Sequence, residues 1–171
     1  MSILTRLLRQ RGDDRAFVRP LWQRIVAVAR DPRWYAEDAI ADTVAGRFDA
    51  ITLVLAVVLI RLERDPATRE ASARLTELFV TDMDGQLRES GIGDLVVGKH
   101  VGRLIGVLGG RLGSYRDALA AADPERLVEA VGRNVTLLAG ASPAAVTARA
   151  LALATALAAS STKQVLAGEF A

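Results

Sequence analysis

A proline stands directly after an aspartate or a serine at four places in this chain, and this pattern constrains the fold more than any other feature. The four pairs are Asp31-Pro32, Asp65-Pro66, Asp123-Pro124 and Ser142-Pro143. Asp and Ser are preferred helix N-caps, and proline is favoured at the first helical position, where its missing N–H costs no hydrogen bond. No alternating strand pattern of useful length stands between these starts. The sequence therefore predicts an all-α protein.

The segment of residues 48–62 is apolar on nearly every side. Because a helix without a polar face must be covered by its neighbours, we expect it at the centre of the protein. The chain is 51% hydrophobic, which is enough for such a core. Periodicity predicts further helices at residues 1–12, 18–29, 66–90, 94–119, 124–139 and 143–166, and a short one from Pro32. The expected fold is a single domain over residues 1–171, a bundle of seven or eight helices with an Ala-rich helix in residues 140–171.

Side chains that carry metal and nucleophilic chemistry are scarce. The chain has no cysteine and one histidine, His100, which excludes disulfides, thiolate sites and multi-histidine metal sites. The run DMDG at residues 82–85 lacks the spacing of a calcium loop, and GIG at residues 91–93 lacks the third glycine of a dinucleotide fingerprint. We expect no metal, no cofactor and no catalytic residue. A small enzyme that uses Asp94, Lys99 and His100 at a helix start is the alternative from that class.

Charge is distributed unevenly, although the net formal charge is only +2. Residues 1–30 carry seven arginines against two aspartates, whereas residues 31–98 carry seven arginines against thirteen acids. Arg6, Arg9 and Arg11 lie on the polar side of the amphipathic helix expected at residues 1–12. Three interpretations of this helix stay open: a solvated face, contact with an anionic membrane or an acidic partner, and contact with nucleic acid. Nucleic acid has the least support, because few aromatic side chains for base stacking lie nearby.

No segment is long enough to cross a membrane. The longest uncharged apolar run, residues 50–60, has eleven residues, whereas a spanning helix needs about 20. We expect a cytoplasmic protein with peripheral contact at the inner face of the plasma membrane.

Glycines recur at a strict spacing of four: Gly98, Gly102, Gly106 and Gly110. Each glycine inside a helix costs roughly 1 kcal/mol relative to alanine, so close approach of another backbone is expected to offset the cost. Two interpretations stay open. The ridge packs against the buried helix at 48–62, or it lines a groove that receives a helix from a partner protein.

Two segments resemble the signatures of a known family. Residues 42–53, DTVAGRFDAITL, resemble its D-x-x-x-GRFD…TL signature, and residues 82–99 resemble its DMD…LRE-x-G-x-GD…VGK signature. Arg61-Leu62, Tyr115 and Arg133-Asn134 also match. Over about residues 20–138 the chain thus resembles a bacterial member of the ubiquinol–cytochrome c chaperone family.

The resemblance implies a non-enzymatic assembly factor that binds newly made cytochrome b and assists assembly of ubiquinol–cytochrome c reductase. It also implies a ribosome or a small co-chaperone as further partners. An RNA- or ribosome-associated adaptor, and a helical interaction module without an assembly role, are the alternatives. We expect the signature residues to divide between scaffold and client surface, and Arg47 to pair with Asp42, Asp49 or another acid. The candidates for partner binding are Asp42, Gly46, Arg47, Phe48, Asp49, Asp82, Asp84, Gly91, Gly93, Asp94, Lys99, Gly102, Arg103 and Gly106.

Overall fold

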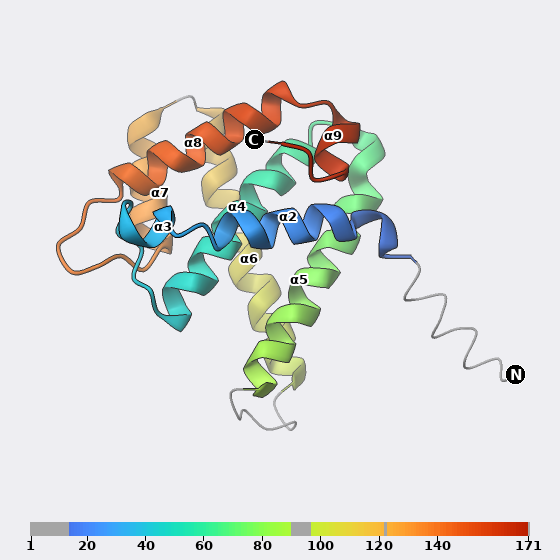
Figure 1. The fold of residues 1–171 in the computed structure, drawn as a ribbon, viewed down its shortest axis with the longest axis horizontal. Coiled ribbons are helices and arrows are strands. Elements are labelled where there is room, and N and C mark those ends of the chain that lie inside the picture. The colour runs from blue at the N-terminus through green and yellow to red at the C-terminus, as the bar shows by residue number, and fades with distance from the viewer. Residues whose placement is uncertain (1–13, 90–96, 122, 171) are drawn as a thin grey trace, which may run out of the picture.

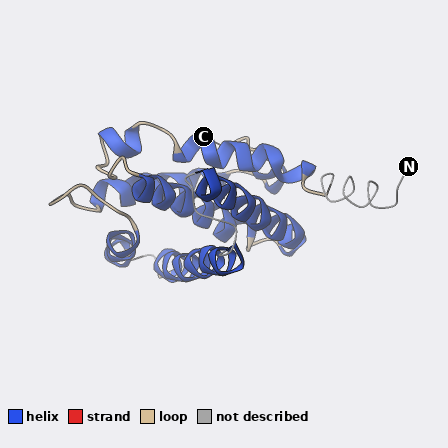
Figure 2. Ribbon diagram, turned by 90° about the horizontal axis from the view of Figure 1, so that it is seen from below, coloured by secondary structure: helices blue, strands red, loops and turns tan. Residues whose placement is uncertain are grey.

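The computed structural model describes residues 14–89, 97–121 and 123–170; the side chains of residues 87–89 and 97–101 lie outside this description. The helix expected at residues 1–12 and the glycines at positions 91 and 93 therefore fall outside the described residues. The elements are η1 (Ala16–Val18), α2 (Arg19–Ala29), α3 (Arg33–Ala36), α4 (Val44–Leu62), η2 (Pro66–Thr68), α5 (Arg69–Glu89), α6 (Val97–Ala120), α7 (Pro124–Asn134), α8 (Ala144–Ala159) and α9 (Thr162–Leu166). No strand occurs in the part of the chain described here (Figure 2).

This architecture confirms the all-α bundle. Seven described helices have five or more residues, and the four-residue α3 makes eight. Helix α4 is central, as the apolar run predicted, and contacts α2, α5, α6 and α8 (Figure 1). Every residue of α4 from Asp49 to Leu62 is buried except the partly exposed Arg61. The helix begins at Val44, four residues before the expected start.

The four Asp-Pro and Ser-Pro pairs start helices as predicted. In each pair the side chain accepts a hydrogen bond from the backbone N–H two residues later. Asp31 accepts from Arg33 at 2.9 Å and Asp65 from Ala67 at 3.0 Å. Asp123 accepts from Glu125 at 3.0 Å and Ser142 from Ala144 at 3.2 Å. Each bond satisfies an amide that the first turn of a helix leaves without a partner.

Two predicted helix ends are wrong. Helix α7 ends at Asn134 instead of residue 139, because the next residues extend and pair with the segment before α4. Ala41 N–H donates to the Thr136 carbonyl at 2.9 Å, and Leu138 N–H to that of Ala39 at 2.9 Å.

The helix expected over residues 143–166 is two helices, α8 and α9, so residues 140–171 are not one helix. Ser160 is extended and ends α8, and a capping box between Ser161 and Gln164 begins α9. The Arg61 guanidinium on α4 donates to the carbonyls of Leu157 and Ser160 at 2.9 and 2.8 Å. The polar residues 160–163 and the Arg61 cation therefore end α8 here, although the alanine-rich periodicity continues along the sequence.

Helices α5 and α6 form a hairpin whose far end projects beyond the other helices (Figure 1). Helix α5 ends at Glu89, close to the stop predicted at Ser90-Gly91. Both helices of this hairpin contact α4. Within the described residues, no helix combines the length and apolarity needed to cross a membrane.

Candidate functional site

The first signature forms the beginning of α4. Thr43 caps the helix, and its Oγ1 accepts a hydrogen bond from the Gly46 N–H at 3.1 Å. Gly46 is buried against the segment that precedes the helix, where a Cβ would lie 1.9 Å from the Ala41 carbonyl oxygen. Only glycine allows this approach of two backbones. Gly46 therefore belongs to the scaffold and leaves no surface for a partner.

Arg47 pairs with Asp42, one of the three kinds of partner expected for it. The Arg47 Nε lies 2.6 Å from Asp42 Oδ1, and the two side chains are 67% and 57% exposed. The hydrogen bond from Arg47 lowers the pKa of the Asp42 carboxyl below its ordinary value. Exposed ion pairs contribute little to stability, so this pair is not needed to hold the fold.

Asp49 is buried and joins three parts of the chain. Its Oδ1 accepts from Arg111 Nη2 on α6 at 2.6 Å, and its Oδ2 accepts from the Thr136 N–H at 2.8 Å and the Thr136 hydroxyl at 2.6 Å. With 5% of its surface exposed, Asp49 cannot meet a partner directly. It fixes Arg111 and the segment after α7 against α4, which makes it a scaffold residue.

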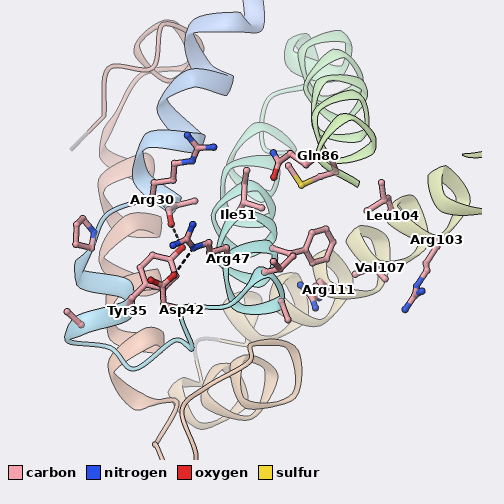
Figure 3. Close-up of a pocket in the computed structure, with 17 residues that line it drawn as sticks. Arg30, Tyr35, Asp42, Arg47, Ile51, Gln86, Arg103, Leu104, Val107 and Arg111 are labelled. Carbon is pink, nitrogen blue, oxygen red and sulfur yellow. Dashed lines mark hydrogen bonds and ion pairs between the residues drawn. The ribbon is translucent and has the colours of Figure 1, made fainter. Parts of the chain in front are cut away.

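A large groove opens beside this helix start. Its volume is about 1580 Å³, and it lies between the α2–α3 connection, the start of α4, the end of α5 and the first half of α6 (Figure 3). It is lined by Ala29, Arg30, Pro32, Tyr35, Ala36, Asp42, Val44, Ala45, Arg47, Phe48, Ile51, Met83, Gln86, Arg103, Leu104, Val107 and Arg111. We call this surface the α4 groove. It brings together Asp42, Arg47, Phe48 and Arg103 of the residues predicted from sequence.

The walls of the α4 groove are held by local contacts. The Tyr35 hydroxyl donates to the Ala29 carbonyl at 2.8 Å, and burial raises the pKa of this phenol. The Phe48 ring packs on Phe79 of α5 with centroids 6.1 Å apart, and the Arg111 guanidinium lies 5.4 Å from the Phe48 centroid. Phe48 thus joins the core to the groove floor.

The second signature is divided between scaffold, groove and undescribed residues. Asp82 on α5 accepts a 2.6 Å hydrogen bond from Trp22 Nε1 and so ties α5 to α2. Asp84 is half-buried on the same helix. Gly91, Gly93 and Asp94 lie outside the described residues, as do Arg6, Arg9 and Arg11, and Lys99 is placed only as a backbone position in the first turn of α6. Predictions that concern these residues stay predictions.

One of the two interpretations of the glycine ridge, packing on the central helix, is wrong for the described glycines. A Cβ added at Gly102, Gly106 or Gly110 would meet no atom within 4 Å, and all three residues are exposed. Helix α6 turns Leu104, Leu108 and Tyr115 inward instead, which leaves the glycines on its outer face. The glycines do not line the α4 groove either. A partner on Gly102 and Gly106 therefore remains a separate prediction.

Several groove residues were not singled out from the sequence. Val107 and Arg111 follow the predicted Arg103 by four and eight residues on α6, a spacing that puts all three on one helix face and that could have been recognised. Arg30 follows the last residue of α2 and reaches the groove only through the tertiary fold, so no sequence pattern indicates it. Among the described residues no three acids or histidines are grouped to hold a metal ion.

Comparison with known protein families shows which family the chain belongs to. Residues 37–171 match the family described as ubiquinol-cytochrome C chaperone. This chain belongs to that family. The resemblance was expected over about residues 20–138, whereas the family match begins at residue 37 and continues to residue 171. As a chaperone of this family, the protein has its first signature at the rim of the α4 groove.

A solved relative supports the same family. The structure is similar to the crystal structure of the Cbp3 homolog from Brucella abortus, with 32% sequence identity and a TM-score of 0.80. The match covers 98% of this chain and 94% of that chain. No curated protein matches this chain.

Proposed function

We propose that this chaperone binds newly made cytochrome b in the α4 groove and holds it during assembly of ubiquinol–cytochrome c reductase. Family membership makes the chain an assembly chaperone for this complex. The identity of the client is our proposal. It follows from the family resemblance together with the groove, because cytochrome b is a membrane protein whose apolar helices need cover before insertion.

The observation that carries this proposal is the position of Arg47. It belongs to the family's GRFD signature, yet it is exposed at the groove rim, whereas Gly46 and Asp49 of the same signature are buried. An exposed charged side chain adds little to folding, so its presence in the motif favours a binding role. The groove floor beneath it includes Phe48 and Ile51.

The protein is expected to act without catalysis, at the inner face of the plasma membrane. Arg6, Arg9 and Arg11 are the residues proposed to contact anionic lipid there. Contact with a ribosome or a small co-chaperone is a further proposal from the family.

Capture from membranes tests the client. The full chain, tagged and expressed in the source cell, should co-purify with cytochrome b, and Arg47→Ala should lower that recovery severalfold. Arg126→Ala is the matched control, because Arg126 on α7 is also 67% exposed and also pairs with an aspartate, Asp123, at 3.5 Å. It should leave recovery unchanged.

Equal recovery with Arg47→Ala and Arg126→Ala would contradict the groove as the binding surface. Recovery of RNA or ribosomes without cytochrome b would contradict the client and favour the adaptor alternative.

A further inference from the structure

The α4 groove combines an apolar floor with a positively charged rim. Its floor and walls include Val44, Phe48, Ile51, Met83, Leu104 and Val107. Val44 is 85% exposed although it is a large aliphatic residue in a helix. An exposed apolar surface inside a groove with polar edges is typical of a site that another molecule covers.

The groove is too large for a typical small ligand. Its volume of about 1580 Å³ exceeds the ~300–1,000 Å³ of most small-molecule pockets. Four separate elements form its walls, and an open channel between helices is the usual seat of an amphipathic helix from a partner. The dimensions thus favour a polypeptide segment.

The charges of the groove are not balanced within it. Four arginines line it, and Asp42 is the one acid among its described lining residues. Asp42 pairs with Arg47, and the buried Asp49 behind the wall pairs with Arg111. The side chains of Arg30 and Arg103 make no hydrogen bond or ion pair with the described residues, although the Arg30 backbone N–H donates to the Val26 carbonyl. The groove therefore offers two unpaired guanidinium groups beside an apolar floor.

Arg111 adds an unused donor to the same wall. Its Nη2 donates to Asp49 at 2.6 Å, but its Nη1 is buried and has no hydrogen-bond partner among the described residues. A buried donor without an acceptor costs free energy, and an acceptor supplied by a ligand would remove that cost. This independent feature also indicates a ligand that carries hydrogen-bond acceptors.

We propose that the α4 groove binds an apolar helix that carries carboxylate side chains on its flanks. This inference rests on the proposed function for the origin of that helix, which would be a segment of the membrane client. Arginine binds carboxylates through two parallel N–H bonds, and these bonds strengthen when an apolar surface excludes water. The apolar floor covers the helix, while the arginines select segments that carry acids.

The distribution of the arginines favours a helix over an anionic lipid. Figure 3 shows Arg30 and Arg47 on the α2 and α4 side of the groove and Arg103 on the α6 side. A phospholipid carries its charge at one end and would leave the arginines of one side without a partner. A helix can carry acids along both flanks of its apolar face.

Peptide binding tests this inference. The probe is a labelled helix of about 18 residues, ~27 Å long, with Leu and Ala on one face, Gln elsewhere and a Glu on each flank. A matched probe has Gln at the two Glu positions. Fluorescence anisotropy with the full chain should give about tenfold tighter binding for the Glu peptide. Equal affinity for the two probes would overturn the proposal.

Substitutions in the groove locate the site. Arg30→Gln combined with Arg103→Gln should abolish the preference for the Glu peptide, and Arg126→Gln on α7 should keep it. Val44→Asp should weaken the Glu peptide more than the Gln peptide without lowering the melting temperature, because an acid in the first turn of a helix is favourable. An unchanged preference in both groove variants would contradict the site.

Vesicles test the lipid alternative. Vesicles of phosphatidylglycerol and phosphatidylcholine should bind the wild type and the double arginine variant equally. If the double variant loses vesicle binding and keeps the peptide preference, the groove binds lipid and the proposal is wrong.

The two proposals fail separately. Recovery of cytochrome b that depends on Arg47, together with no preference for the Glu peptide, would overturn only the acidic-helix inference. A Glu peptide that binds in the groove while no cytochrome b is recovered would support this inference and overturn the proposed client.

Discussion

Arg47 and Asp49 stand two positions apart on α4 but lie in different surroundings. The Arg47 side chain is 67% exposed at the groove rim, whereas the Asp49 side chain is 7% exposed and accepts three hydrogen bonds. Side chains two positions apart on a helix point in directions about 160° apart, and so lie on nearly opposite sides of it. One signature can therefore contain both a binding residue and a residue that fixes the fold.

Asp49→Asn should lower the free energy of unfolding by about 3 kcal/mol, because it leaves the Arg111 guanidinium buried without its counter-charge. Urea unfolding followed by circular dichroism measures the change. Asp42→Asn removes an ion pair that is exposed, so it should leave the unfolding midpoint unchanged. A loss as large for Asp42→Asn as for Asp49→Asn would contradict the division between scaffold and rim.

Asp31 is expected to titrate at unusually low pH. Hydrogen bonds from the Arg33 side chain and backbone lower the pKa of this carboxyl from 3.8 to about 2. Because the folded pKa is the lower one, the contribution of Asp31 to stability is present above about pH 4 and is lost as the pH falls through 2. Arg33→Gln should raise the pKa toward 3.8 in a carboxyl-carbon NMR titration, while the pKa of Asp65 should not move.

At the scale of elements, α6 has two unlike faces. Leu104, Leu108 and Tyr115 pack inward, and the glycines form an outer face without side chains. The four-residue spacing of the glycines was apparent in the sequence, but their direction was not. It depends on which face of the helix buries its leucines, and the leucine stripe four residues apart is the stronger determinant.

Gly102→Ala combined with Gly106→Ala should raise the free energy of unfolding by about 1 kcal/mol per site. Both positions have open space for a methyl group, and alanine is the better helix former. Gly46→Ala should instead lower it by about 3 kcal/mol, since its Cβ would overlap the Ala41 carbonyl. Thermal unfolding measures the change in both variants, and a large loss of stability in the double variant would contradict the outward direction of the ridge.

The sequence predicted most helices because their signals are local. A cap such as Asp65 or Asp123 acts within two residues of itself, and the apolar run of α4 needs no knowledge of its neighbours. The end of α7 was missed because Asp49, far away in the chain, accepts from Thr136 and draws that segment out of the helix. The groove was only partly predicted for the same reason. Arg103 was predicted, whereas Arg30 follows the end of α2 and reaches the groove only in the folded chain.

At the scale of the whole molecule, one hydrophobic core includes residues of every described α-helix. Trp22 and Trp34 both belong to this core but contact different helices. Trp22 donates to Asp82 on α5, and its ring meets Phe79 edge-on with centroids 6.3 Å apart. Trp34 lies in α3, and the Arg149 guanidinium of α8 lies 5.6 Å from its ring centroid. The two indoles therefore report on two different contacts between helices, α2 with α5 and α3 with α8.

A shared core predicts that both of these contacts are lost together on unfolding. Trp34→Phe leaves Trp22 as the reporter of the α2–α5 contact, and Trp22→Phe leaves Trp34 as the reporter of the α3–α8 contact. In each variant, the urea midpoint from tryptophan fluorescence should coincide with the midpoint of that variant from far-ultraviolet circular dichroism. An earlier fluorescence change for Trp22 alone would mean that the α5–α6 hairpin separates from α2 before the bundle unfolds. The groove would then open by movement of that hairpin, and a client helix could enter or leave without unfolding of α4.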